Sequence, residues 1–110
     1  MVNHRIQYLR DRKGNPVGCV AIKLLPQVEH SRQLVVYQTS ILNPLDNFDR
    51  ALARQLALGR MVEKPLTVRV MSNPSMREIT EEVMRDIAAD SGQPTRARQA
   101  AKRWLTQLEG

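Results

Sequence analysis

The sequence predicts a single α+β domain whose elements follow the order β-β-β-α-β-α-α. Three extended apolar segments, separated by polar turns, occupy the first part of the chain. Apolar residues then recur at helical spacing, and one short segment between two such stretches alternates apolar and polar residues. The length of 110 residues suits one domain, and no repeat or linker marks a boundary, so we expect residues 1–110 to fold as one unit.

The first three strands are expected to form an antiparallel three-stranded meander. Gly14, Asn15 and Pro16 follow the first strand, and these residue types supply the positive and fixed φ angles of a hairpin loop. A polar loop from Pro26 to Arg32 precedes the third strand. The predicted strands are residues 3–10, 17–25 and 33–42.

The next element is a helix expected from about residue 46 to residue 62, which provides the crossover from the third strand to the fourth. Pro44 blocks further strand pairing, and Asp46 is placed to cap the helix. We expect the meander to bury one apolar stripe of this helix. The stripe consists of Phe48, Leu52 and Leu56 and is widened by Ala51, Leu58 and Val62.

Gly59 stands inside this otherwise strong helix, where glycine costs about 1 kcal/mol relative to alanine. Two explanations stay open. Gly59 allows close packing against the sheet or against a second chain, which leaves a homodimer open, or it simply ends the helix early.

The last third of the chain is expected to hold a fourth strand and two C-terminal helices. Leu66, Val68 and Val70 alternate with polar or longer residues, as a half-buried strand does. Ser75 and Glu78 have the spacing of a capping box, and Gly92 offers a left-handed residue after the second helix. The apolar faces are Met76, Ile79, Val83 and Ile87 in the second helix, and Ala97, Ala100, Ala101, Trp104, Leu105 and Leu108 in the third.

The chain is basic, with 17 Lys and Arg against 11 Asp and Glu and a formal net charge of +6. Residues 73–93, which include the second helix, carry a net charge of −3, whereas residues 94–110 carry +3. A polyanionic partner such as DNA or RNA fits this balance, although many small basic proteins bind no specific anion.

Other features of the sequence exclude several classes of protein. A lone cysteine, Cys19, and the lack of an apolar run near the roughly 18 residues of a membrane span predict a cytoplasmic protein with no membrane segment. Cys19 is expected to be a small packing residue. His4 and His30 have no neighbouring Cys or paired carboxylate, so we expect neither a metal nor a cofactor.

The predicted order of meander, helix and strand is similar to the start of the ribonuclease H-like fold. The two-metal nuclease site of that fold uses carboxylates on the first strand, on the first helix and at the end of the fourth strand. Only Asp49, on the helix, could correspond here. We therefore expect no nuclease activity and no catalytic residue.

Residues 40–60 carry a second resemblance. An N-P-x-D-x-F-x-R pattern begins at Asn43 and is followed by an A-x-G-R pattern that ends at Arg60. This layout resembles small uncharacterised proteins of bacteriophages and mobile elements. The resemblance implies a genetic setting and carries no activity with it.

The leading hypothesis is a non-enzymatic protein that binds nucleic acid by electrostatic contacts to the backbone, because an aromatic content of 4% leaves few side chains for base stacking. A solvated turn at the hairpin tip, and pairing of Arg50 with Asp46, are the structural alternatives. The expected contacts are Arg10, Arg12 and Lys13 at the hairpin tip, Arg50 and Arg54 on the first helix, and Arg96, Arg98, Lys102 and Arg103 on the third.

Two other classes of function compete with this hypothesis. The first is a small regulator or inhibitor of a host enzyme, which would use the acidic second helix or an exposed sheet edge as its interface. The second is an enzyme whose site is completed by a partner chain. Nucleic-acid affinity that falls steeply with salt would favour the leading hypothesis, and stoichiometric co-purification with one protein would favour the regulator.

Overall fold

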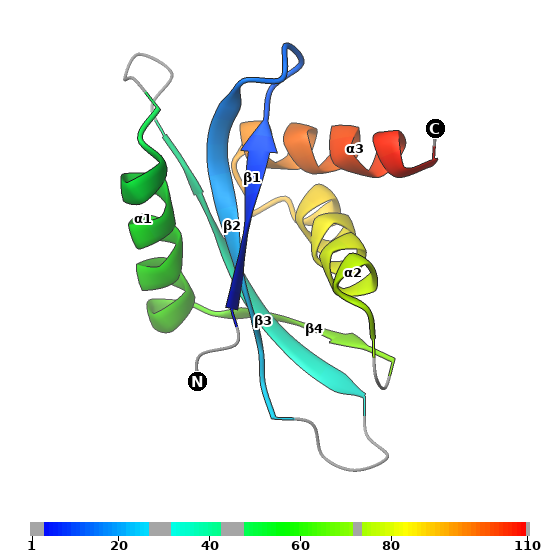
Figure 1. Ribbon diagram of the computed structural model, residues 1–110. Helices are drawn as coiled ribbons and strands as arrows, with labels where there is room; N and C mark the ends of the chain where they lie inside the picture. Colours follow the sequence, from blue (N-terminus) through cyan, green and yellow to red (C-terminus); the bar gives the residue numbers. More distant parts are fainter. Residues whose placement is uncertain (1–3, 27–31, 43–47, 72–73, 110) are drawn as a thin grey trace.

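The computed structural model describes residues 4–26, 32–42, 48–71 and 74–109, and the element order is the predicted β-β-β-α-β-α-α (Figure 1). The strands form one antiparallel sheet in the order β1-β2-β3-β4, so β1 and β4 are its edges. No helix in these ranges is long and apolar enough to cross a bilayer. The elements are β1 (His4–Arg10), β2 (Pro16–Leu24), β3 (Gln33–Ile41), α1 (Arg50–Glu63), β4 (Leu66–Val70), α2 (Met76–Ala89) and α3 (Thr95–Glu109).

The sheet lies between two layers of helix, with α1 on one face and α2 and α3 on the other (Figure 1). This arrangement explains the unbroken apolar run at the centre of β2, because a strand covered on both faces has no solvent side. Val20 and Ile22 pack with α2 and α3, whereas Cys19 and Ala21 pack with α1. The two faces of β2 therefore offer different room to their helices.

The predicted buried stripe of α1 is wrong, although the order of elements is right. Leu52 is 44% exposed, Leu56 is 38% exposed and Val62 is 82% exposed, Ala51 is exposed, and Phe48 is only half-buried. The buried residues of α1 are instead Ala53, Ala57 and Met61. The physical reason is the small size of Cys19 and Ala21 opposite the helix, because small side chains on the sheet pack with the alanines of α1, and Met61 completes the cluster near the end of the helix.

The start of α1 also differs from the prediction. The helix begins at Arg50, and the Asp49 carboxylate accepts the backbone N–H of Leu52 at 3.1 Å, so Asp49 is the cap. The predicted cap, Asp46, and the predicted strand blocker, Pro44, lie outside the described residues. Asp49, the carboxylate that the nuclease comparison singled out, is thus used to order the helix.

Gly59 neither ends α1 nor packs it against the sheet. The helix continues to Glu63, and a Cβ at Gly59 would meet no atom within 4 Å. Both of the explanations that concern a single chain are therefore wrong.

The capping box of α2 is present as predicted, since Ser75 accepts the Glu78 N–H and the Glu78 side chain accepts the Ser75 N–H. The end of α2 differs from the prediction. The helix stops at Ala89 with Asp90 extended, and Gly14 is the glycine with positive φ among the described residues, so Gly92 is not a left-handed cap. The Asp90 carboxylate instead accepts the Gly92 N–H at 2.8 Å.

Two buried polar contacts fix α2 and the loop after it to β3. The Tyr37 hydroxyl donates a hydrogen bond to the Asp86 carboxylate, and the Thr39 hydroxyl donates one to the Gln93 side-chain oxygen at 2.6 Å. Burial raises the pKa of the Tyr37 phenol above its usual range, and the bond to Asp86 raises it further. These contacts set where α3 begins, and α3 then returns across the sheet towards β1.

Candidate functional site

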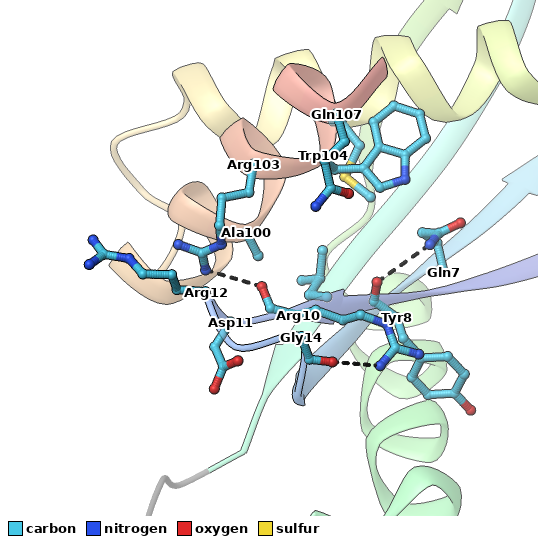
Figure 2. Close-up of a pocket in the computed structure, with 12 residues that line it drawn as sticks. Gln7, Tyr8, Arg10, Asp11, Arg12, Gly14, Ala100, Arg103, Trp104 and Gln107 are labelled. Carbon is cyan, nitrogen blue, oxygen red and sulfur yellow. Dashed lines mark hydrogen bonds between the residues drawn. The ribbon is translucent and has the colours of Figure 1, made fainter. Parts of the chain in front are cut away.

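A groove of about 300 Å³ lies between the β1–β2 hairpin and α3, on the face of the sheet that α2 also covers. Its walls bring together segments about 90 residues apart in the sequence (Figure 2). Arg10 and Arg12 come from the hairpin, and Arg103 comes from α3. Two of the nine cations predicted to bind nucleic acid, Arg12 and Arg103, therefore meet at this site, whereas the Arg10 side chain runs toward Tyr8 and donates to the Gly14 carbonyl (Figure 2).

The hairpin tip is an ordered turn. The Asp11 carboxylate accepts the backbone N–H groups of Lys13 and Asn15, both at 2.9 Å, and Gly14 takes the positive φ of 87° that the turn requires. The Arg10 guanidinium donates to the Gly14 carbonyl at 2.9 Å. Arg12 is left exposed at the rim of the groove, with Lys13 exposed beside it.

Arg103 joins α3 to the hairpin. Its guanidinium Nη2 donates to the Arg10 carbonyl at 3.1 Å, across 93 positions of sequence. The side chain is half-buried, and its Nε–H is buried with no acceptor among the described residues. Helix α3 thus holds the Arg103 guanidinium at the wall of the groove, and its Nε–H can still donate a hydrogen bond to a ligand.

The far end of the groove is less charged. In Figure 2, Arg12 and Arg103 lie toward one end, while Trp104 and Gln7 lie toward the other. Gln107, one turn after Arg103 and Trp104, also lines the groove, and Ala100 and Met84 contribute apolar surface. The site therefore combines guanidinium groups with one indole and two amides.

The sequence interpretation did not place Gln7, Trp104 and Gln107 at a common site, because it assigned Trp104 only to the apolar face of the third helix. A local signal did exist. Arg103 and Gln107 are four residues apart and so share one flank of a helix, and Gln7 lies two residues before Leu9 and so shares its face of a strand. The sequence pattern did not indicate that the flank of α3 with Arg103 and Gln107 faces β1.

The electrostatic balance of the groove is positive. Asp11 supplies the one carboxylate among its lining residues, and that carboxylate is turned into the hairpin, where it bonds backbone N–H groups. Arg10, Arg12 and Arg103 make no ion pair with any residue in the described part of the chain. The charge of Arg12 and Arg103 is accordingly available to an anion that enters the groove.

The other three predicted cations of α3 do not line this groove. Arg96 donates to the Leu42 carbonyl at 2.8 Å, and Arg98 donates to the Thr95 hydroxyl at 3.4 Å. Arg96 and Arg98 are half-buried, whereas Lys102 is exposed. Helical spacing puts Arg98 and Lys102 on the flank of α3 away from Arg103, so α3 divides its charge between two sides.

The predicted cations of α1 lie on the opposite face of the sheet. Arg50 places its guanidinium 5.2 Å from the centroid of the Tyr8 ring, a cation–π contact that holds it against β1. Arg54 is exposed one turn later. The predicted set of nine therefore does not form one surface, and the α1 pair is separate from the groove.

The remaining candidate residues of the sequence show structural roles or lie outside the description. Burial raises the pKa of the Cys19 thiol, whose Sγ contacts the Ser40 hydroxyl at 3.7 Å. His4 is exposed at the start of β1, and His30 is outside the described residues. Within the described ranges, no three His, Cys, Asp or Glu side chains are grouped so as to hold a metal ion.

Comparison of the chain with protein-family models, with curated protein sequences and with solved structures gives no match. The groove is therefore interpreted from its own residues and geometry.

Proposed function

We propose that this protein binds nucleic acid, and that it does so at the groove between the hairpin tip and α3. The observation that carries the proposal is that Arg12, from the hairpin, and Arg103, from α3, line one groove without an opposing ion pair among the described residues. The Arg10 side chain is instead turned toward Tyr8 and bonded to Gly14. Guanidinium groups are planar donors that match phosphate oxygens, and arginine clusters of this kind bind phosphate backbones.

The surroundings of the groove support an extended anion over a small one. Lys13 is exposed at the hairpin tip next to Arg12, so positive charge continues beyond the hairpin wall of the groove. A polyanion gains from each further cation along its path, because each phosphate contact releases a condensed counterion.

The competing protein-binding regulator is less well supported at the β1 edge. The Tyr8 carbonyl accepts the Gln7 side-chain amide at 3.4 Å, and the Arg10 carbonyl accepts Arg103. Side chains that occupy the carbonyls of an edge strand hinder the addition of a foreign strand. These contacts at the β1 edge do not bear on the acidic helix α2, which is the other surface that a protein partner could use. The binding experiment below distinguishes that alternative from nucleic-acid binding.

The salt dependence of binding tests the proposal. We expect a labelled oligonucleotide to bind with an affinity that falls as salt rises, by about 0.7 to 0.9 in log–log slope for each phosphate contact. An Arg12→Ala/Lys13→Ala variant should flatten the slope by up to about 2, because both side chains are exposed and the turn is held by Asp11 and Gly14. Fluorescence anisotropy at four or more salt concentrations measures the slope.

The matched control removes two exposed arginines far from the groove. Arg69→Ala/Arg77→Ala lowers the net charge by the same amount, on β4 and α2, and should leave the slope nearly unchanged. Equal flattening by both variants would mean that only net charge matters. If the wild type binds no nucleic acid at low salt, the proposal fails and the protein-binding regulator becomes the better hypothesis.

A further inference from the structure

The groove contains more than positive charge, and this inference, which rests on the proposed function, concerns the form of nucleic acid that it accepts. Trp104 is half-buried: it packs against the core cluster of α2, α3 and the sheet, and it also lines the groove. An indole supported in this way is a preorganised stacking surface for a base. Duplex DNA does not present the face of a base, so such a surface is of use only to a single strand.

Two amide side chains flank the indole in the groove. Gln107 is exposed and makes no hydrogen bond to another described residue, and the Gln7 amide donates one long bond, 3.4 Å, to the Tyr8 carbonyl. A glutamine amide offers two donors and one acceptor oxygen, which is the combination that pairs with the polar edge of a base. The Gln107 amide can therefore serve a ligand with all its groups, and Gln7 can do so with its side-chain oxygen and its second N–H.

The opposite end of the groove supplies the phosphate contacts. Arg103 keeps a buried Nε–H without an acceptor among the described residues, and Arg12 is exposed beside it. A buried donor without a partner is costly, and an incoming phosphate oxygen or its bound water would satisfy it. The volume of about 300 Å³ is at the small end of the range for ligand sites, which suits one nucleotide.

We infer that the groove holds one nucleotide of a single-stranded polynucleotide. The base lies on Trp104, its polar edge meets Gln7 and Gln107, and its phosphate meets Arg12 and Arg103. The low aromatic content of the chain favoured backbone contact alone; the placement of its single tryptophan in the same groove as Arg12 and Arg103 is the observation that adds stacking.

Intrinsic fluorescence tests this inference directly, because Trp104 is the only tryptophan of the chain. The probes are a 12-residue oligothymidine, a 12-residue oligouridine and a blunt 12-base-pair duplex. At equal salt, we expect at least one single strand to quench Trp104 emission and to bind about 10-fold more tightly than the duplex. The two single strands differ in the 2′-hydroxyl and in the 5-methyl group of thymine, so the tighter one identifies the preferred type of strand, and either result supports the inference.

Variants separate stacking from folding. Trp104→Leu keeps an apolar side chain against the core and removes the flat ring, so single-strand affinity should fall about 5- to 100-fold, while duplex affinity changes little. Because Trp104→Leu can also weaken the fold, Gln107→Ala provides a second test. Gln107 is exposed, and its loss should reduce both the quenching and the single-strand affinity several-fold without changing the melting temperature.

The failure of this inference is distinguishable from the failure of the proposed function. If single strand and duplex bind equally, with a normal salt slope and no quenching, the nucleotide site is wrong and the backbone-binding function stands. Affinity unchanged by Gln107→Ala and Trp104→Leu would also overturn the site. If no probe binds, both the site and the function are wrong.

Discussion

At the scale of single residues, polar side chains fix how α2 and α3 lie on the sheet. Tyr37 is fully buried in β3, and its hydroxyl donates to Asp86, so one phenol joins the central sheet to α2. Arg103 has the corresponding role at the other end of the helical layer, where it joins α3 to the Arg10 carbonyl. The groove depends on both contacts, because together they fix the position of the helical layer over β1.

The raised pKa of Tyr37 gives a stability that depends on pH. The unfolded phenol ionises near pH 10, whereas the folded phenol stays protonated, so the contribution of Tyr37 is complete below pH 10 and is lost as pH rises further. Replacing Tyr37 with Phe should cost about 1.5 to 3 kcal/mol at pH 8, because Asp86 loses its donor. Between pH 9 and pH 11 the difference between the two proteins should shrink by roughly 1 kcal/mol.

Urea unfolding of both proteins at a series of pH values measures this difference. Wild type and the Tyr37→Phe variant serve as each other's control, since every other titrating group is common to them. A stability difference that stays constant up to pH 11 would contradict the assigned contact.

At the scale of elements, α1 is an example of packing overriding hydrophobic pattern. Leu52 and Leu56 are the stronger apolar signal in the sequence, yet the sheet buries Ala53, Ala57 and Met61. Cys19 and Ala21 on the sheet are small, and they pack in one cluster with Ala53, Ala57 and Met61, so packing between the two elements decides which face of α1 is buried. The exposed leucines leave α1 with an apolar outer surface.

This packing predicts unequal costs for two substitutions in α1. Met61→Ala should destabilise the protein by about 2 to 3 kcal/mol, because it empties a buried position. Leu52→Ala should cost less than about 1 kcal/mol, since its side chain is 44% exposed. Thermal unfolding followed by circular dichroism compares the two variants, and a larger cost for Leu52→Ala would mean that α1 is rotated from the position described.

Much of the fold could be predicted from the sequence, and the reasons are local. Turn residues such as Gly14 and the capping pair Ser75 and Glu78 act over a few positions, so they mark the ends of elements well. The buried face of α1 could not be predicted from α1 alone, because it depends on Cys19 and Ala21 in another element. A comparison of the small residues of β2 with the alanines of α1 would have indicated which face of α1 is buried.

The candidate site was predictable to the same extent. The cations of the hairpin and of α3 are visible as charge in the sequence, and the structure brings Arg12 and Arg103 to one groove. Their convergence depends on α3 folding back over β1, a contact across more than 90 positions that no local pattern encodes. For the same reason, the separate location of Arg50 and Arg54 on the other face was not foreseen.

At the scale of the whole molecule, charge is divided between the elements. One end of the sheet carries the hairpin tip, helix α3 and the first turns of α1, and β4 lies toward the other end (Figure 1). The segment with net charge −3 contains α2, where Glu81 pairs with Arg85 at 2.6 Å. A polyanion that approaches the molecule is therefore directed toward the hairpin and α3 and away from α2.

Amide chemical-shift mapping tests this location most directly. In a titration of ¹⁵N-labelled protein with the 12-residue oligothymidine, we expect the largest shifts at residues 10–14 and 99–107 and at the indole N–H of Trp104. Residues 50–63 of α1 and 76–89 of α2 should change little, and they serve as internal controls. Shifts concentrated on α1 around Arg50 and Arg54, or shifts concentrated on α2, would show that the groove between the hairpin and α3 is not the binding surface.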